Sequence, residues 1–175
     1  AFPFIRGPGP FHLVPFTLAG SAKSDHSFPE VLVPLDIVVC DDSPRDGREA
    51  MMFDASGDAA DREAFADRCA DDRHHFRFIV SPEDAEQLQD LRTFTRDLMG
   101  RMEKDLETRL DWVAVDHWNT DNPHIHILVR GVAEDGSDLV VDRAYMSEGV
   151  RGRASEIATL ELGPRNEQEI DASLA

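Results

Sequence analysis

Two strand-like segments joined by a short polar turn constrain the fold of this chain more than any other feature. Residues 111–118 and 123–131 are rich in β-branched and aromatic side chains, and residues 119–122 (Asn-Thr-Asp-Asn) have the composition of a turn. A hairpin closed on this turn predicts three opposed pairs: Trp118 with Pro123, His117 with His124, and Val115 with His126. Directly opposed residues have Cβ atoms about 4.5–5.5 Å apart. The hairpin therefore gathers three imidazoles on one face of a sheet.

The three histidines predict a metal site. His124 and His126 are two positions apart, so they point to the same side of a strand. One histidine on a strand is usually a plain polar residue, whereas three that converge need something that uses their lone pairs. Three neutral imidazoles with open coordination positions form the arrangement that a catalytic metal requires. This ligand type favours Zn²⁺, and Mn²⁺ and similar ions also accept imidazole.

The remaining pattern predicts an α+β fold, a two-layer sandwich with an antiparallel central β-sheet and helices packed on one face. Hydrophobic periodicity predicts further strands at 74–80 and 139–141 and helices at 59–70, 81–107 and 142–162. Ser81 is expected to cap the long helix and Pro82 to occupy its first turn. Residues 31–40 are apolar enough for a strand, which Pro34 would confine to a sheet edge. The histidines are expected on the open face, opposite to the helices.

Length and charge limit what kind of protein this is. A chain of 175 residues suits one domain, which we expect at 44–165, after an atypical Pro-rich segment at 1–43 and before a polar tail at 166–175. No apolar run is long enough for a membrane span, and two cysteines without a CxxC pair favour a reducing, cytoplasmic setting. The net charge of −17 argues against DNA binding through a bulk positive field. Any DNA must be held at a local site, helped by the charge of a metal.

The histidine spacing also carries a family resemblance. The segment His117-x6-His124-x-His126, with a proline before the histidine pair and a β-branched run after it, resembles the metal motif of HUH endonucleases. Among these it is most similar to the motif of plasmid mobilisation relaxases. Similar flanking segments lie at 75–82, 111–116 and 160–165, and the resemblance covers roughly residues 45–170.

The resemblance implies a specific activity. Such relaxases nick one strand of single-stranded DNA at an origin of transfer, in plasmid mobilisation and conjugation, where other relaxosome proteins are further partners. A tyrosine hydroxyl attacks the phosphate and becomes linked to the 5′ end. The three histidines hold a divalent ion, Mg²⁺ or Mn²⁺, on the phosphate oxygens, where it neutralises charge that builds in the transition state.

The tyrosine that the resemblance implies is missing from its usual place. The family carries it near the N-terminus, ahead of a segment similar to Arg45-Asp46-Gly47, whereas the sole tyrosine here is Tyr145. Three interpretations follow: the chain is a relaxase remnant without its own nucleophile, Tyr145 is the nucleophile, or another group or a metal-bound water cleaves the DNA. The competing functions are a strand-nicking transesterase, impaired or intact, a metal-dependent phosphodiesterase, and a non-catalytic module that binds single-stranded DNA.

Several charged residues are predicted to support this site. Asp116 and Asn119 flank the first histidine and either hold an imidazole N–H or cap the turn. Five arginines are candidates for contacts with DNA phosphates: Arg77, Arg130, Arg143, Arg151 and Arg153. For three of them a role without DNA is also considered: Arg77 as an exposed residue of a strand, and Arg151 and Arg153 as partners of nearby glutamates.

Overall fold

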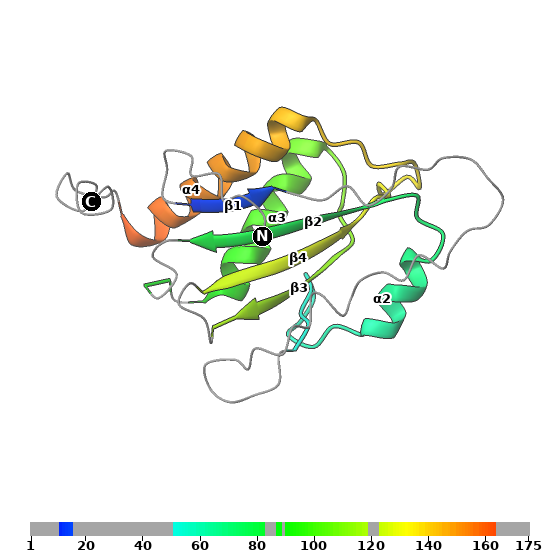
Figure 1. The fold of residues 1–175 in the computed structure, drawn as a ribbon, viewed down its shortest axis with the longest axis horizontal. Helices are drawn as coiled ribbons and strands as arrows, with labels where there is room; N and C mark the ends of the chain where they lie inside the picture. Colours follow the sequence, from blue (N-terminus) through cyan, green and yellow to red (C-terminus); the bar gives the residue numbers. More distant parts are fainter. Residues whose placement is uncertain (1–10, 16–50, 83–86, 89, 119–122, 164–175) are drawn as a thin grey trace.

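An antiparallel sheet of four strands, in the order β1-β2-β4-β3, forms the middle of the structure (Figure 1). This computed structural model describes residues 11–15, 51–82, 87–88, 90–118 and 123–163. The strands are β1 (Phe11–Pro15), β2 (His75–Pro82), β3 (Trp112–His117) and β4 (His124–Arg130). The predicted strand at 31–40, the turn at 119–122 and the tail at 166–175 lie outside the described residues.

The predicted hairpin is confirmed together with its register. β3 and β4 pair antiparallel, with His117 opposite His124 and Val115 opposite His126. On the other side of β4, Ile79 of β2 lies opposite His126. The backbone at His126 is therefore paired on both sides, and strand register alone brings the three histidines together.

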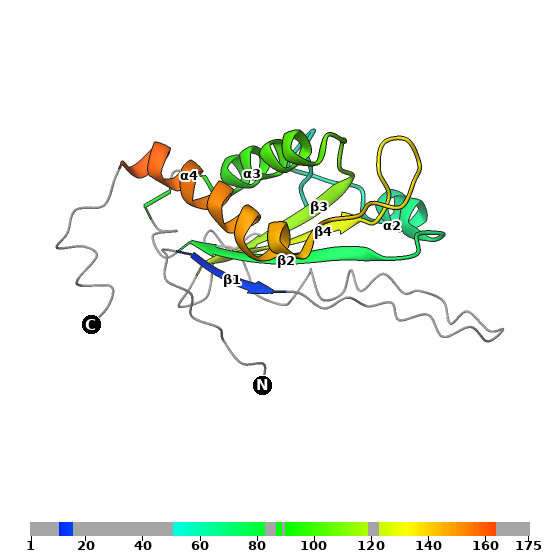
Figure 2. The ribbon, with the colours of Figure 1, turned by 90° about the horizontal axis from the view of Figure 1, so that it is seen from above.

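Two helices pack on one face of the sheet, α3 (Leu91–Leu106) and α4 (Val150–Leu162), the latter preceded by a π-helical segment, η1 (Tyr145–Gly149) (Figure 2). One side of α3 is apolar and packs on alternate residues of the strands. The shared core includes Leu91, Phe94, Leu98, Met102, Val150 and Ile157 from the helices and Phe76, Phe78, Ile125, Ile127 and Val129 from the sheet. This arrangement confirms the predicted α+β fold. Within the described residues, no helix has the length and apolar character needed to cross a bilayer.

The opposite face, which carries the histidines, is more covered than the sequence predicts. A short helix, α2 (Arg62–Cys69), and Met52 pack there on apolar residues of β3 and β4. Phe53 pairs with Ala114 through two main-chain hydrogen bonds of 2.9 Å each, which extends the sheet beside β3. The expected open face is thus a second, smaller apolar layer beside the histidines, and His117 is fully buried.

The long helix begins later than predicted. Ser81 and Pro82 are the last residues of β2, where they pair with β1. The Ser81 hydroxyl donates to the carbonyl oxygen of Pro123 at 3.1 Å. α3 starts at Leu91, with Asp90 as its N-cap. Pairing with a strand far away in the sequence therefore overrides a local capping pattern.

Two predictions in the last third of the described chain also need correction. Residues 139–141 form no strand, and an isolated bridge between Val132 and Asp138 closes this loop instead. The last helix has the predicted extent, but its first part is the π-helix η1. Gly149 makes this conformation feasible, because a Cβ there would lie 2.4 Å from Cδ2 of Tyr145.

Candidate metal centre

Three histidine rings come together where β3 ends and β4 begins. The ring centroids of His117, His124 and His126 are separated by 5.1, 4.9 and 5.0 Å in the three pairs. His117 is fully buried, His126 is nearly so, and His124 is half-buried. Imidazoles that share one ion through bonds of about 2.0–2.1 Å place their ring centroids roughly 5 Å apart. The spacing of the cluster therefore suits a metal site.

The planes of the rings do not converge on one point. Those of His117 and His124 are stacked, with an interplanar angle of 14°. The lone pair of a ring nitrogen lies in the ring plane, so two stacked rings cannot both aim at one ion. Accordingly, no group of three or more His, Cys, Asp and Glu side chains among the described residues stands in an arrangement that could hold a metal. The donors fit a divalent ion in chemistry and spacing, whereas the ring planes of His117 and His124 in this structure are not set to share one ion.

Burial keeps His126 in its neutral form. Burial is the main cause that lowers the pKa of His126 to about 4, with contributions from His124, His117 and the positive charge of Arg77. Within the described part of the chain, the buried Nδ1 of His126 has no hydrogen-bond partner. Metal ligation needs neutral histidine, and a buried ring nitrogen costs free energy unless a ligand uses it. Both properties suit His126 to bind a cation.

Arg77 of β2 lies on the same face of the sheet as the histidines. It pairs with Leu128, and the next residue on its face, Ile79, pairs with His126. Diagonal neighbours on adjacent strands are about 7–8 Å apart, which brings the guanidinium group within reach of the histidine cluster. Its Nε is buried and has no hydrogen-bond partner among the residues that the structure describes. Arg77 is thus placed to bind an anion beside the histidines.

Asp116 lies on the opposite face from His117, as alternation along a strand requires. Its carboxylate accepts hydrogen bonds from Nε of Arg92 at 3.1 Å and from Nε1 of Trp118 at 2.7 Å. Asp116 therefore does not hold an imidazole N–H, which is one of its two predicted roles; Asn119 and the turn that Asp116 was alternatively predicted to cap lie outside the described residues. No sequence pattern marks Arg92, because its partner is 24 positions away.

Tyr145 is also on the other side of the sheet. Its ring packs against the core shared by α3, α4 and the strands, and its hydroxyl donates to Oδ2 of Asp105 at 2.7 Å. Burial, followed by this hydrogen bond, raises the pKa of the phenol. Arg143 is exposed just before η1, and Arg151 lies on α4. The structure does not bring this group of predicted residues to the histidines.

Arg130 and Arg153 are held by carboxylates. Nε and Nη2 of Arg130 each donate to an oxygen of Asp72 at 2.7 Å. Arg153 binds both oxygens of Asp105 in the same way, at 2.8 and 2.7 Å, and also Glu156 at 2.9 Å. These contacts raise the pKa of both guanidinium groups. Of the five predicted arginines, Arg77 is therefore the one that combines a place beside the histidines with an unused donor among the described atoms.

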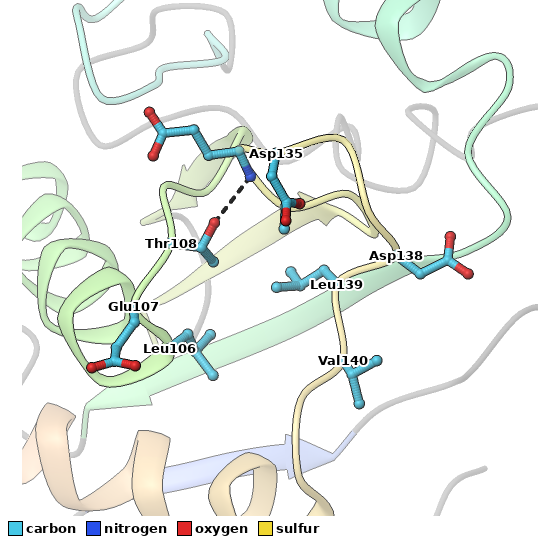
Figure 3. A pocket seen from close by; sticks show the side chains of 9 residues that line it. Leu106, Glu107, Thr108, Asp135, Asp138, Leu139 and Val140 are labelled. Carbon is cyan, nitrogen blue, oxygen red and sulfur yellow. Dashed lines mark hydrogen bonds between the residues drawn. The ribbon is translucent and has the colours of Figure 1, made fainter.

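A separate hollow lies at the other end of the sheet, between the end of α3 and the loop at 133–140 (Figure 3). It has a volume of about 510 Å³ and is open to solvent. The Thr108 hydroxyl in its wall accepts a hydrogen bond from the Glu134 amide at 2.9 Å. Four of its lining residues are acidic: Glu107, Glu134, Asp135 and Asp138. Because these carboxylates repel phosphate, the hollow is not a candidate for DNA binding.

Comparison with known families assigns most of the chain to one family. A family model described as "Relaxase: MobA/VirD2-like, nuclease domain" matches residues 48–156, which is more than half of the chain and includes all three histidines and Arg77. Comparisons with curated proteins and with solved structures gave no match. The chain therefore belongs to the MobA/VirD2-like relaxase nuclease domain family.

Proposed function

We propose that this domain binds single-stranded DNA at an origin of transfer and cleaves one phosphodiester bond there, beside a Mg²⁺ or Mn²⁺ ion held by His117, His124 and His126. The observation that carries the proposal is the gathering of the three imidazoles by strand register in a chain of the relaxase family. The cellular process would be plasmid mobilisation or conjugation, with other relaxosome proteins as partners.

The residues around the histidines suit phosphate chemistry. A divalent cation at the histidines supplies a Lewis acid that neutralises charge building on the phosphate oxygens. Neutral imidazole ligands leave that positive charge uncancelled, whereas carboxylate ligands would reduce it. Arg77 donates from its guanidinium group to a phosphate oxygen and fixes the position of the DNA backbone. These local charges offset the net charge of −17, which repels DNA over the rest of the surface.

A second function, hydrolysis by water, is favoured by the position of Tyr145. This sole tyrosine packs on the face of the sheet opposite to the histidines, and its hydroxyl is bound to Asp105. A metal-dependent phosphodiesterase would need no tyrosine. A module that binds single-stranded DNA without cleaving it is a third alternative, which the cleavage experiment distinguishes.

Metal uptake tests the centre directly. Calorimetric titration of the metal-free protein with Mn²⁺ should show one bound ion per chain. Joint replacement of His124 and His126 with alanine should abolish this uptake, because two of the three ligands are removed. Tyr145→Phe, on the other face, is the control and should bind Mn²⁺ like the wild type. Undiminished uptake in the double variant would contradict the proposed centre.

Cleavage of labelled oligonucleotides that carry origin-of-transfer sequences separates the functions. Nicking that leaves the protein covalently attached to DNA supports the transesterase, and an adduct that persists in Tyr145→Phe comes from another nucleophile. Nicking that leaves free ends supports the phosphodiesterase, and binding without nicking supports the non-catalytic module. Absence of binding, or equal cleavage of duplex DNA, contradicts the proposal for a relaxase.

A further inference from the structure

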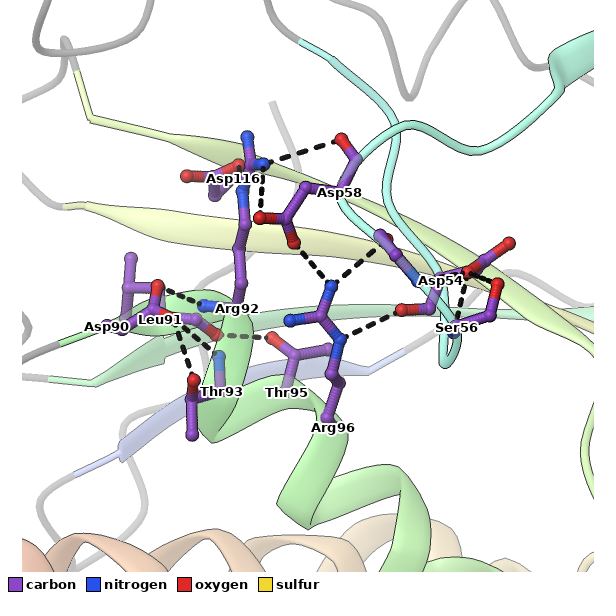
Figure 4. Close-up of polar contacts among 11 residues, drawn as sticks. Asp54, Ser56, Asp58, Asp90, Leu91, Arg92, Thr93, Thr95, Arg96 and Asp116 are labelled. Atoms are coloured by element: carbon purple, nitrogen blue, oxygen red, sulfur yellow. Dashed lines mark hydrogen bonds and ion pairs between the residues drawn. The ribbon is translucent and has the colours of Figure 1, made fainter.

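A buried carboxylate joins the strand that carries His117 to the start of α3. Asp116 immediately precedes His117 in β3 and is 7% exposed. Nε of Arg92, the second residue of α3, donates to Oδ1 of Asp116 at 3.1 Å (Figure 4). Nε1 of Trp118 donates to Oδ2 at 2.7 Å. Each carboxylate oxygen is therefore bound, one by the helix and one by the residue that follows His117.

Arg92 is itself held in place by the segment beside β3. Its Cζ lies 5.2 Å from the ring centroid of Phe53, and its Nη1 lies 3.8 Å from a carboxylate oxygen of Asp58. Phe53 in turn pairs with Ala114 in β3. Cation–π attraction holds a guanidinium group that lies over an aromatic ring in place. Arg92 is therefore oriented toward Asp116 before any ligand binds.

Arg96, one turn further along α3, makes similar contacts without touching Asp116. Its Cζ lies 5.4 Å from the ring centroid of Phe53. Its guanidinium donates to the carboxylate of Asp58 and to the carbonyl oxygens of Asp54 and Gly57 (Figure 4). Arg96 thus fastens the same segment to the same helix. The difference between the two arginines is the bond to the strand that carries His117.

The bond between Arg92 and Asp116 lies at the end of β3, where it has the most effect on the position of the histidines. The pair of His117 and His124 is the last of the β3–β4 ladder. The bridge on the outer side of β3 lies earlier, at Ala114. Strand ends open locally at low free energy unless side chains hold them. Because Asp116 and His117 point to opposite faces, a fixed Asp116 also fixes the backbone from which His117 projects.

We propose that Arg92 is a positioning residue for the three-histidine centre: its bond to Asp116 fixes the end of β3, and with it the backbone from which His117 projects toward the other two histidines. This inference rests on the proposed function, because it takes the histidines as ligands of a metal ion. Removal of groups that orient metal ligands typically weakens metal binding about 10- to 100-fold. An effect of that size separates a positioning role from a contribution to stability alone.

Arg92→Gln and Arg96→Gln in the otherwise intact chain form a matched pair. Mn²⁺ affinity is measured by calorimetry, and stability is measured by urea unfolding without metal. We expect Arg92→Gln to weaken Mn²⁺ binding about 10-fold or more and Arg96→Gln to change it by less than about twofold. Both should lower the unfolding midpoint to a similar degree. Arg92→Lys, which keeps a cation near Asp116, should restore most of the affinity.

A readout on the metal-free protein completes the test. In ¹H–¹⁵N spectra of the imidazole nitrogens, the His117 signals should move in Arg92→Gln and stay in place in Arg96→Gln. If Arg92→Gln does not fold, Asp116→Asn, which weakens the same bond from the other side, takes its place in the comparison with Arg96→Gln. Equal Mn²⁺ affinities in the matched pair, or an unmoved His117 signal in Arg92→Gln, overturn the role of Arg92 and leave the metal centre standing. A wild-type chain that takes up no Mn²⁺ overturns the proposed function itself.

Discussion

Arg77 and Arg153 carry the same charge but differ in whether a carboxylate binds their guanidinium group. The Nε of Arg77 is buried beside the histidines and unpaired among the described residues, whereas Arg153 is bound by Asp105 and Glu156. A buried charged group is costly unless an anion pairs with it. A hydrogen bond to a charged group contributes about 1.5–3 kcal/mol. Affinity for phosphate should therefore depend on Arg77 and not on Arg153.

Arg77→Gln should weaken binding of single-stranded DNA by roughly 10- to 100-fold at low salt, as measured by fluorescence anisotropy. The same variant should bind Mn²⁺ slightly more tightly, because the Arg77 charge repels a cation and lowers the pKa of His126. Arg153→Gln is the control and should change neither affinity. Equal losses of DNA affinity in the two variants would show that the position of Arg77 has no special importance.

At the scale of elements, prediction from the sequence succeeds where the residues that pair with each other lie close together in the chain. The β3–β4 hairpin is such a case, because His117 and its partner His124 lie only seven positions apart in the sequence. The start of α3 is the opposite case. Ser81 and Pro82 obey the local rules for a helix start, yet they pair with β1, which lies far earlier in the chain. A weak local preference is overridden when a strand supplies main-chain hydrogen bonds.

The cap that begins α3 gives a prediction for this element. The Asp90 carboxylate accepts hydrogen bonds from the amides of Arg92 and Thr93, at 3.0 and 3.2 Å. Asp90→Ala should lower the free energy of unfolding by about 1 kcal/mol, because two amides lose their partner. Asp90→Asn should retain most of the stability, since asparagine caps about as well as aspartate. Urea unfolding measures both, and a loss in Asp90→Asn equal to that in Asp90→Ala would point to charge and not to capping.

For the whole molecule, the features that could not be predicted from the sequence are those that depend on contacts between distant segments. The histidine cluster is predictable because its three members lie within one hairpin, and the helix-covered face is predictable from the periodicity of α3. The bonds of Asp116 to Arg92 and of Tyr145 to Asp105 join residues 24 and 40 positions apart. Strand alternation alone predicts that Asp116 and His117 point to opposite faces of the sheet. The partner of Asp116, Arg92, depends on how α3 crosses that sheet. The layer formed by α2 on the histidine face depends on the same kind of long-range packing.

The stability of the molecule should fall between pH 7 and pH 5. Burial lowers the pKa of His126 to about 4 and also lowers that of His75, whereas both histidines have a pKa near 6.5 in the unfolded chain. Below pH 6.5 the unfolded state therefore binds protons that the folded state does not, and folding loses free energy as the pH decreases. For His126 the loss is about 2 kcal/mol between pH 7 and pH 5. Carboxylates such as Asp105, whose pKa lies below 3.8, lose their contribution only in more acidic solution.

Urea unfolding of the metal-free protein at pH 7, 6 and 5 measures this dependence. The decrease should be smaller by about 2 kcal/mol in His126→Gln, because that variant has no imidazole to protonate in the unfolded state. Asp105→Asn is the matched control, since its carboxylate is ionised throughout this range, and it should retain the full decrease. An identical decrease in His126→Gln and in the wild type would mean that His126 is not held neutral by burial.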